Sequence, residues 1–564
     1  MTADPIERVA RDAFGYKELR PGQREAIEAV LAGRDTLALM ASGAGKSAIY
    51  QVAGLLLDGP SVIVSPLIAL QQDQVEALDE RLPGEAAPLN SRLGASARRR
   101  TLQRLEEGEV EFLFLAPEQL ANAEVRAELE RVRPSLVVVD EAHSISEWGH
   151  DFRPDYLRIG PLIDQLGHPT TLALTATAAP PVRREISERL GLRDPAVIVR
   201  GFDRPNIHLA VERHHELHHK EAALLAHVAE LEKPGIIYVA TRRAAEEVAE
   251  GVKGRGVRAE AYHAGLASHE RDAVQQRFMD GATEVVVATT AFGMGIDKPN
   301  VRFVLHEAAS ESLDEYYQEI GRAGRDGQPA KALLLYRPED LGTRRFLRGT
   351  GLVTPDELDR VARAVEHAGG PVEPEQLRTQ LDLSRSKLTA AVNRLHDAGE
   401  LDVRADGEIT RRRGAPAVDT AVAAAVLADH DREQFADSRL AMMRDYAEHV
   451  GCRRRALLGY FGEHAPERCG NCDDCDRFFA AGGEAGGRVH HQTHAYARGG
   501  AGGADSPPAD AHKFPAGTRV RHRAWGEGEV QRVEDGQLVV LFDAVGYKTL
   551  ALDIVSAGHL LEAV

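Results

Sequence analysis

The feature that most constrains this chain is an alternation of short apolar runs with helical patterns, which continues from Phe14 to about Tyr336. Strands that alternate with helices predict parallel sheets covered by helices. Roughly 320 residues are too many for one such core, so we expect two α/β lobes. The runs predicted as strands are Asp35–Met40, Ser61–Val64, Glu111–Leu115, Leu136–Val139 and Thr170–Leu174, followed by Gly235–Val239, Glu284–Ala288, Phe303–His306 and Ala332–Tyr336.

Beyond Tyr336 the sequence changes character. Residues 351 to 480 are mostly helical in pattern, and Ser384–Ala398 places Leu388, Val392 and Leu395 on one helical face. A stretch rich in Gly, Ala and Pro follows from about residue 480 and predicts a flexible linker. The last fifty or so residues return to short strands.

Net charge argues against a surface that binds nucleic acid everywhere. The 564 residues include 69 Lys and Arg against 87 Asp and Glu, which gives a net charge of −18. Phosphate polymers attract basic surfaces, so DNA or RNA binding requires a local basic groove on an acidic body. The chain has no apolar stretch of the ~18–20 residues that a membrane helix needs, and its start lacks a signal-peptide layout. We therefore expect a cytoplasmic protein with no membrane partner.

A glycine-containing loop between a predicted strand and a predicted helix is the first candidate site. Its sequence, Ser-Gly-Ala-Gly-Lys-Ser, covers residues 42–47. Small residues such as Gly43 and Gly45 let backbone N–H groups surround phosphates, while Lys46 reaches the β- and γ-phosphates and Ser47 binds Mg²⁺. Taken alone, the loop could also be an ordinary glycine-rich turn.

Two carboxylates supply the partner that such a loop needs. The strand predicted at Leu136–Val139 runs directly into Asp140 and Glu141. At the carboxyl end of a buried strand, Asp140 is placed to hold Mg²⁺ and Glu141 to orient and deprotonate an attacking water. The alternative is a pair of carboxylates that cap a helix.

A third candidate site lies in the second predicted lobe. Arg322 and Arg325 are spaced by small residues and follow Gln318 closely in sequence. Arginines suit a phosphoryl-transfer transition state, because negative charge spreads over its oxygens. A basic surface loop is the competing interpretation.

The four cysteines of the chain are Cys452, Cys469, Cys472 and Cys475. Cys-x-x-Cys steps chelate one ion, and four thiolates complete a tetrahedral zinc site. A redox pair would need a thioredoxin-like βαβ setting, which the pattern lacks.

The segment His215–His219 also matches the short H-E-x-x-H pattern of zinc proteases, but no further ligand accompanies it.

In their order, these motifs resemble superfamily-two helicases and, among them, the RecQ family of DNA helicases. The similar segments are Phe14–Tyr16 with Arg20–Gln23, Ser65–Leu70, Ala116–Glu118, Ser144–Pro154, Thr175–Thr177, Phe202–Asn206, Tyr262–Leu266, Ala288–Pro299 and the cysteine region. The chain departs from the family where Ala41–Ala44 replaces Pro-Thr-Gly-Gly and Ser144 replaces Cys. Neither change removes a catalytic group.

The resemblance implies residue roles beyond the phosphate site. Tyr16 would stack on adenine, and Arg20 and Gln23 would bond to the nucleotide. The segment Ser144–Pro154 resembles the family's aromatic-rich loop, which senses single-stranded DNA and reports to the ATP site. Aromatic faces stack on bases and cationic side chains add to them. The DNA-contacting residues that it implies are Trp148, His150, Phe152 and Arg153.

The resemblance also implies an activity and its cofactors. We expect an ATP-dependent DNA helicase of the bacterial nucleoid that uses ATP, Mg²⁺ and Zn²⁺ and unwinds forked or tailed duplexes three-prime to five-prime in DNA repair or recombination. The alternative is a DNA-stimulated translocase or remodeller without net unwinding, or one that prefers RNA. Another class, an adaptor with an inactive motor, conflicts with the intact catalytic groups. We expect a monomer.

The predicted fold class is α/β, with two RecA-like parallel-sheet motor lobes and three smaller domains. The third domain resembles a winged helix, with Ser386, Thr389 and Asn393 on the outward face of its second helix; its place before the cysteines reverses the family's usual order. The last resembles the SH3- or Tudor-like tails of other helicases, which contact RNA polymerase or nucleic acid. The expected domains are lobe one at 1–208, lobe two at 209–345, the winged-helix-like domain at 346–415, the helical zinc-binding domain at 416–479, the linker at 480–511 and the SH3/Tudor-like β-barrel at 512–564.

Overall fold

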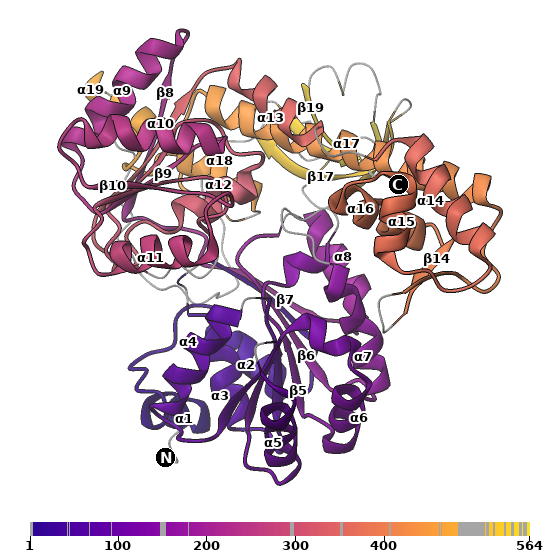
Figure 1. Cartoon of the computed structure of the whole chain (residues 1–564). Helices are drawn as coiled ribbons and strands as arrows, with labels where there is room; N and C mark the ends of the chain where they lie inside the picture. The colour runs from indigo at the N-terminus through magenta and orange to yellow at the C-terminus, as the bar shows by residue number, and fades with distance from the viewer. Residues whose placement is uncertain are drawn as a thin grey trace. The chain divides into compact units, whose positions relative to one another are not determined.

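The computed structural model describes most of the chain up to residue 482 and parts of the C-terminal region. It describes residues 4–482 except 42, 44, 67, 92, 147–153, 179, 294–297, 350–352, 405–407, 462 and 464, and then residues 514, 518–522, 525–534, 537–542, 546–551, 555 and 561–563. The chain divides into two compact units, whose helices and strands are labelled in Figure 1. The first comprises Met1–Gly201, Gly293–Asp297 and Glu339–Glu433, and the second comprises Phe202–Phe292, Lys298–Pro338 and Gln434–Val564.

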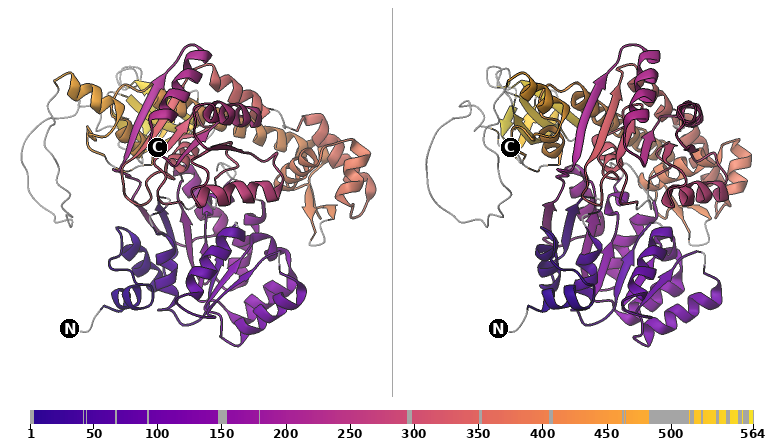
Figure 2. Two further views of the ribbon diagram at one scale, coloured as in Figure 1. Left: turned by 60° about the vertical axis from the view of Figure 1, so that its left-hand side comes forward. Right: turned by 90° about the vertical axis from the view of Figure 1, so that its left-hand side faces the viewer.

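The first unit is built on a seven-stranded sheet in the order β3-β4-β2-β5-β6-β1-β7, in which every neighbouring pair is parallel. Its strands are β1 (Thr36–Met40), β2 (Ser61–Val64), β3 (Ala86–Leu89), β4 (Phe112–Leu115), β5 (Leu136–Val139), β6 (Thr170–Thr175) and β7 (Ala196–Arg200). Its helices are α1 (Pro5–Asp12), α2 (Gln23–Leu31), α3 (Ser47–Gly54), α4 (Ile68–Asp79), α5 (Ala95–Glu106), α6 (Ala123–Val132), α7 (Ile159–Gln165) and α8 (Pro180–Leu190), with 3₁₀ turns η1 (Pro117–Ala121), η2 (Ala142–Ile145) and η3 (Pro154–Arg158). The sheet and its flanking helices are visible in Figure 2.

The second unit contains a six-stranded parallel sheet in the order β10-β11-β9-β12-β13-β8. Its strands are β8 (Ile207–Arg213), β9 (Gly235–Tyr238), β10 (Ala259–Tyr262), β11 (Val285–Ala288), β12 (Phe303–His306) and β13 (Ala330–Tyr336), and its helices are α9 (Leu217–Glu230), α10 (Arg242–Lys253), α11 (Ser268–Met279) and α12 (Leu313–Ile320). The predicted pair of parallel-sheet lobes is confirmed.

The central strands form because most of their residues are apolar on both faces. All residues of β1, β2, β4, β5, β9, β11 and β12 are buried, as expected for parallel strands covered by helices. Every strand predicted from an apolar run is present. The four strands outside that prediction, β3, β7, β8 and β10, are the edge strands of the two sheets.

A smaller helical region belongs to the first unit. It contains α13 (Asp340–Gly349), α14 (Pro355–Ala368), α15 (Pro374–Leu381), α16 (Arg385–Asp397) and the antiparallel pair β14 (Leu401–Val403) and β15 (Ile409–Arg411), and α17 (Val418–Glu448) follows. Leu388, Val392 and Leu395 are buried in its core, as the helical pattern predicts. Ser386 and Thr389 are exposed on α16.

The C-terminal part of the second unit contains α18 (Arg453–Tyr460) and α19 (Asp473–Ala480), followed by a small antiparallel sheet in the order β19-β18-β17-β16-β20. Its strands are β16 (Arg519–His522), β17 (Gly526–Glu534), β18 (Gln537–Phe542), β19 (Gly546–Ala551) and β20 (Leu561–Ala563). Val530, Val540 and Phe542 are in its core. None of the helices in the described part of the chain is long and apolar enough to cross a membrane.

A half-buried carboxyl directly before β4, that of Glu111, provides a test of this packing. Burial and the nearby Glu85 raise the pKa of Glu111 to about 7, above its ordinary 4.5. The folded state therefore favours the protonated form, so the group destabilises the fold progressively as pH rises from 4.5 to 7 and by a constant amount above that. We expect Glu111→Gln to raise the Tm by about 2 °C at pH 8 and to leave it unchanged near pH 4.5.

Differential scanning fluorimetry across this pH range measures the effect. Glu76→Gln, which changes an exposed carboxylate on α4, is the matched control and should show no such pH dependence. An equal Tm for Glu111→Gln and the unmodified protein at pH 8 would contradict the burial argument.

Candidate functional site

The phosphate loop lies between β1, which ends at Met40, and α3, which begins at Ser47. Gly43 and Gly45 both have φ of 77°, in the left-handed region that favours glycine. A Cβ on Gly45 would lie 2.9 Å from Gln23 Nε2, so no larger residue fits there without a shift. The loop therefore has the tight backbone that phosphate binding by N–H groups requires.

The predicted adenine-recognition residues lie beside this loop. Gln23 donates from Nε2 to Gly45 O at 2.8 Å and accepts from Arg20 N at 2.6 Å, and the Arg20 guanidinium donates to Gly43 O. Tyr16 donates from its hydroxyl to Gln51 Oε1 of α3 at 2.7 Å. In this structure Arg20 and Gln23 thus hold the phosphate loop itself, a contact that the sequence does not reveal.

The two predicted carboxylates follow β5, in the same sheet as β1 and separated from it by β6. Asp140 Oδ1 accepts from Glu141 N at 3.0 Å, and Tyr156 donates from its hydroxyl to Asp140 O at 2.9 Å. Glu141 has φ of 48°, a conformation that non-glycine residues rarely adopt. Such backbone strain clusters at functional sites, where the surrounding structure holds it in place.

The effects of Lys46, Asp140 and Glu141 on neighbouring pKa values indicate that the carboxylate pair lies close to the phosphate loop. Burial and the charge of Glu141 raise the pKa of Asp140 to about 6, while Lys46 opposes the shift. Burial and the charge of Asp140 raise the pKa of Tyr50 on α3, and a hydrogen bond with Ser47 opposes that shift. Ser47 and Asp140 thus both lie near the Tyr50 hydroxyl. A hydroxyl and a carboxylate there are oxygen ligands of the type that Mg²⁺ takes.

His143 contacts both Glu141 and the last residue of β6. His143 Nδ1 lies 3.0 Å from Thr175 Oγ1 and 3.3 Å from Glu141 Oε2. Thr175 Oγ1 in turn donates to Thr177 O at 2.9 Å. The sequence indicates the motif that contains Thr175 but not this contact, because it requires the ends of two neighbouring strands to meet.

The predicted arginines follow α12, in the second unit. A Ser312 cap starts the helix, and Glu319 near its end is held by His306 Nε2 at 2.7 Å and by the Ser310 hydroxyl at 2.8 Å. Arg322 is buried and Arg325 half-buried. Gln318 is also half-buried.

The predicted DNA-contacting residues Trp148, His150, Phe152 and Arg153 lie outside the described residues. The last described residue before them is Ser146, whose hydroxyl donates to the buried Glu185 at 2.5 Å.

The four cysteines come together as the sequence predicts. Their Sγ atoms all lie within 4.8 Å of one another, and Cys469 Sγ and Cys475 Sγ are 3.9 Å apart. Zn–S bonds of about 2.3 Å in a tetrahedron place sulfurs about 3.8 Å apart, so the cluster fits zinc. Cys452 and Cys472 stand at the N-termini of α18 and α19, which fixes both helices to the cluster.

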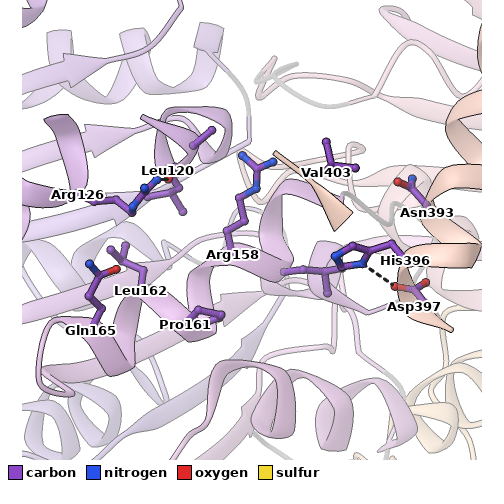
Figure 3. Close-up of a pocket in the computed structure, with 12 residues that line it drawn as sticks. Leu120, Arg126, Arg158, Pro161, Leu162, Gln165, Asn393, His396, Asp397 and Val403 are labelled. Carbon is purple, nitrogen blue, oxygen red and sulfur yellow. Dashed lines mark hydrogen bonds and ion pairs between the residues drawn. The ribbon is translucent and has the colours of Figure 1, made fainter. Parts of the chain in front are cut away.

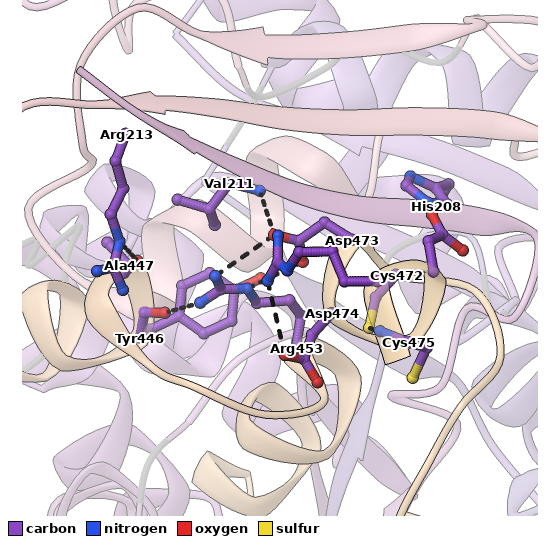
Figure 4. A network of polar contacts seen from close by, with 12 residues as sticks. His208, Val211, Arg213, Tyr446, Ala447, Arg453, Cys472, Asp473, Asp474 and Cys475 are labelled. Carbon is purple, nitrogen blue, oxygen red and sulfur yellow. Dashed lines mark hydrogen bonds and ion pairs between the residues drawn. The ribbon is translucent and has the colours of Figure 1, made fainter. Parts of the chain in front are cut away.

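Residues 446–480, called the cysteine region from here on, are attached to strand β8 by a polar network (Figure 4). Arg453, only 2% exposed, pairs with Asp473 at 3.0 Å and donates to Tyr446 O at 2.7 Å. Asp473 also accepts from Val211 N at 3.5 Å, and Arg213 donates to Ala447 O at 3.3 Å.

The H-E-x-x-H segment does not form a protease site. Helix α9 begins at Leu217, so His215 lies before the helix and does not share a helical face with His219. Zinc proteases of this pattern need both histidines on one face.

A cavity in the first unit lies where α7 and its neighbours face α16 and β14 (Figure 3). Its volume is about 470 Å³, within the size range of ligand pockets. Arg126 and Arg158 line one side, and His396 lies 3.7 Å from Asp397 on the other. No sequence pattern indicates this cavity, because its two sides come from distant segments.

Three family models match the chain in order. Residues 20–185 match the DEAD/DEAH box helicase model, residues 219–327 match the helicase conserved C-terminal domain, and residues 418–476 match the RecQ zinc-binding model.

Individual relatives agree with these models. The chain is 41% identical over 362 residues to the probable ATP-dependent DNA helicase RecS of Bacillus subtilis, which covers 64% of this chain and 73% of that protein. It is 36% identical over 478 residues to the ATP-dependent DNA helicase RecQ of Pasteurella multocida, which covers 84% of this chain but 63% of that longer protein. In fold, it is similar to the helicase MrfA bound to DNA and AMPPNP, with a TM-score of 0.51, 16% identity and coverage of 73% of this chain and 62% of that one.

Removing one cysteine tests the metal site. We expect Cys472→Ser to lose the bound zinc, about one ion per chain in the unmodified protein, because three thiolates and a hydroxyl hold zinc more weakly than four thiolates. Zinc released from the purified, chelator-washed protein measures this. His449→Ala, which changes a histidine three residues before Cys452, should keep its zinc; loss of zinc in this control would indicate a different ligand set.

Proposed function

The chain belongs to the RecQ family of ATP-dependent DNA helicases, and we propose that it couples ATP hydrolysis to separation of DNA strands, moving three-prime to five-prime. The observation that carries this proposal is the meeting of the phosphate loop with Asp140 and Glu141 at the carboxyl ends of β1 and β5 in one sheet. Ligands of open α/β sheets bind at that edge.

The chemistry of each side chain gives its proposed role in ATP hydrolysis. Lys46 and the loop N–H groups hold the β- and γ-phosphates, and Glu141 orients and deprotonates the attacking water. Ser47 and Asp140 hold Mg²⁺, which neutralises phosphate charge when bound. Arg322 and Arg325 offset the charge that develops on the γ-phosphoryl group.

Three further assignments complete the proposed nucleotide site. Gln318, half-buried in α12 shortly before Arg322, is assigned to the same site as the two arginines. Tyr16 stacks on adenine, and Arg20 and Gln23 exchange their bonds to the phosphate loop for bonds to the nucleotide.

We propose that Trp148, His150, Phe152 and Arg153 bind the single strand by stacking and charge. With a net charge of −18, the protein would bind DNA through such local contacts, and its affinity would fall steeply with salt.

The accessory regions have proposed roles as well. The helices α14–α16 with β14 and β15 have the element order of a winged helix, which would present Ser386 and Thr389 to DNA or to a protein. Asn393, expected on the same outward face, is half-buried and lines the cavity of the first unit. The small sheet β16–β20 is proposed as an SH3- or Tudor-like module that tethers the motor to RNA polymerase or nucleic acid. The domain boundaries given above, a monomeric state and action at the nucleoid in repair or recombination belong to the same proposal.

Substituting the catalytic carboxylate tests the chemistry. Glu141→Gln should lower kcat for single-stranded-DNA-stimulated ATP hydrolysis about 10³-fold, because the general base is lost, while ATP binding persists. Lys46→Ala should abolish turnover and also weaken ATP binding. A phosphate-release assay and fluorescent-nucleotide titration measure both effects. Glu188→Gln, which changes an exposed glutamate on α8, is the control; full turnover by Glu141→Gln would overturn the assignment.

Strand separation is a distinct test from hydrolysis. On a forked DNA with a three-prime tail, we expect ATP-dependent release of the labelled strand, with none from a duplex that has only a five-prime tail. ATP hydrolysis without strand release on any fork would favour the translocase, and release from RNA forks alone would contradict DNA as the substrate.

A further inference from the structure

The segment that follows β7 has contacts that the proposed chemistry does not use. We call residues 202–206, Phe-Asp-Arg-Pro-Asn, the linking segment, and residues 321–325, Gly-Arg-Ala-Gly-Arg, the arginine loop. The linking segment, the arginine loop and the cysteine region all belong to the second unit.

One side of the linking segment holds the backbone of the arginine loop. Arg204 Nη1 donates to Gly321 O at 3.1 Å, while its Nη2 donates to Ala323 O at 2.8 Å and Gly324 O at 3.0 Å. Asn206 Nδ2 donates to the same Gly324 O at 2.8 Å. A planar guanidinium that bonds three carbonyls of one turn fixes the shape of that turn.

Gly324 makes this close approach feasible. Its φ is 56°, and a Cβ added there would lie 2.5 Å from Asn206 Nδ2. The arginine loop is therefore shaped around the linking segment. Arg322 lies in sequence between the bonded carbonyls of Gly321 and Ala323, and Arg325 directly follows that of Gly324.

The other side of the linking segment is held by residues next to the cysteines. Arg454, two residues after Cys452 and 5% exposed, pairs with Asp203 at 2.7 Å. Asn471, which precedes Cys472, donates from Nδ2 to Pro205 O at 2.8 Å. These contacts flank Arg204 in sequence on both sides.

Aromatic packing adds to the same attachment. The Phe202 ring stacks on Phe461 with centroids 4.6 Å and planes 12° apart, and Phe202 N donates to Glu463 at 2.9 Å. Tyr317 of α12 donates from its hydroxyl to Phe202 O at 2.8 Å. The linking segment is thus enclosed between the cysteine region and the helix that leads into the arginine loop.

We propose that the cysteine region positions the arginine loop for ATP hydrolysis through the linking segment, with Arg204, Arg454 and Asn471 as positioning residues. This inference rests on the proposed function, in which Arg322 and Arg325 act on the γ-phosphoryl group. Because the arginines act on charge that develops in the transition state, a loosened loop lowers kcat and leaves ATP affinity intact.

Asn471→Ala is the main test, because it removes the bond to Pro205 and retains all four cysteines. We expect kcat for DNA-stimulated ATP hydrolysis to fall about 5-fold, consistent with one lost hydrogen bond. Arg204→Gln, which loses the three-carbonyl fork, should lower kcat about 10²-fold. KM for ATP and zinc content should stay close to those of the unmodified protein in both variants, and the Tm should stay close in Asn471→Ala.

Hydrogen–deuterium exchange supplies a readout that is independent of activity. Amides of residues 318–328 should exchange faster in Asn471→Ala and Arg204→Gln than in the unmodified protein. Arg477→Ala is the matched control, since this exposed arginine of the cysteine region pairs only with Asp473 and Asp474 among the described residues; it should leave kcat and exchange unchanged.

The outcomes separate the positioning role of the cysteine region from the proposed ATP-dependent activity. Unchanged exchange and unchanged kcat in both variants would overturn the positioning role, as would a fall in activity that appears as a raised KM. An unmodified protein that does not hydrolyse ATP would contradict the proposed function, while exchange would still decide whether the cysteine region holds the loop.

Discussion

Both large sheets depend on burying parallel strands on their two faces. Strands such as β4, β5 and β11 are apolar along their whole length and have no polar positions to offer chemistry. Reactive groups are therefore concentrated at the ends of the strands and in the segments that leave them. Because all strands of a parallel sheet end on the same edge, groups that are distant in sequence meet there: Lys46 after β1, Asp140 after β5 and Thr175 at the end of β6.

How far the sequence determines the fold differs between central and edge strands. The apolar runs predict every central strand to within about two residues, because burial on both faces demands such runs. Edge strands have one uncovered side, so they accept mixed composition. Pro88 in β3, Glu260 in β10 and the alternating polar residues of β8 hide those strands from a hydrophobicity criterion.

The candidate site also contains residues that the sequence predicts and contacts that it does not. Lys46, Glu141 and the four cysteines are recognisable because their chemistry requires fixed residue types at short spacing. Contacts across the fold are not, since they depend on which loops meet. The strained φ of Glu141 and the bonds from Arg20 and Gln23 to the phosphate loop are of this second kind. The bonds of Arg204 are also of this kind, because they reach backbone carbonyls more than a hundred residues away. Every residue has a backbone carbonyl, so no sequence pattern marks these acceptors.

The attachment of the cysteine region to β8 has a consequence for how the protein behaves with other copies of itself. β8 is an edge strand, and its outward backbone groups are already engaged: Ile207 O accepts from Arg454, Leu209 N donates to Asn471 O at 3.4 Å and Val211 N donates to Asp473. Uncovered edges of this length are templates for pairing with another chain. The cysteine region therefore also covers the β8 edge of the second sheet. A protein deprived of zinc would expose a strand edge that is open to pairing with another chain, in addition to losing the metal.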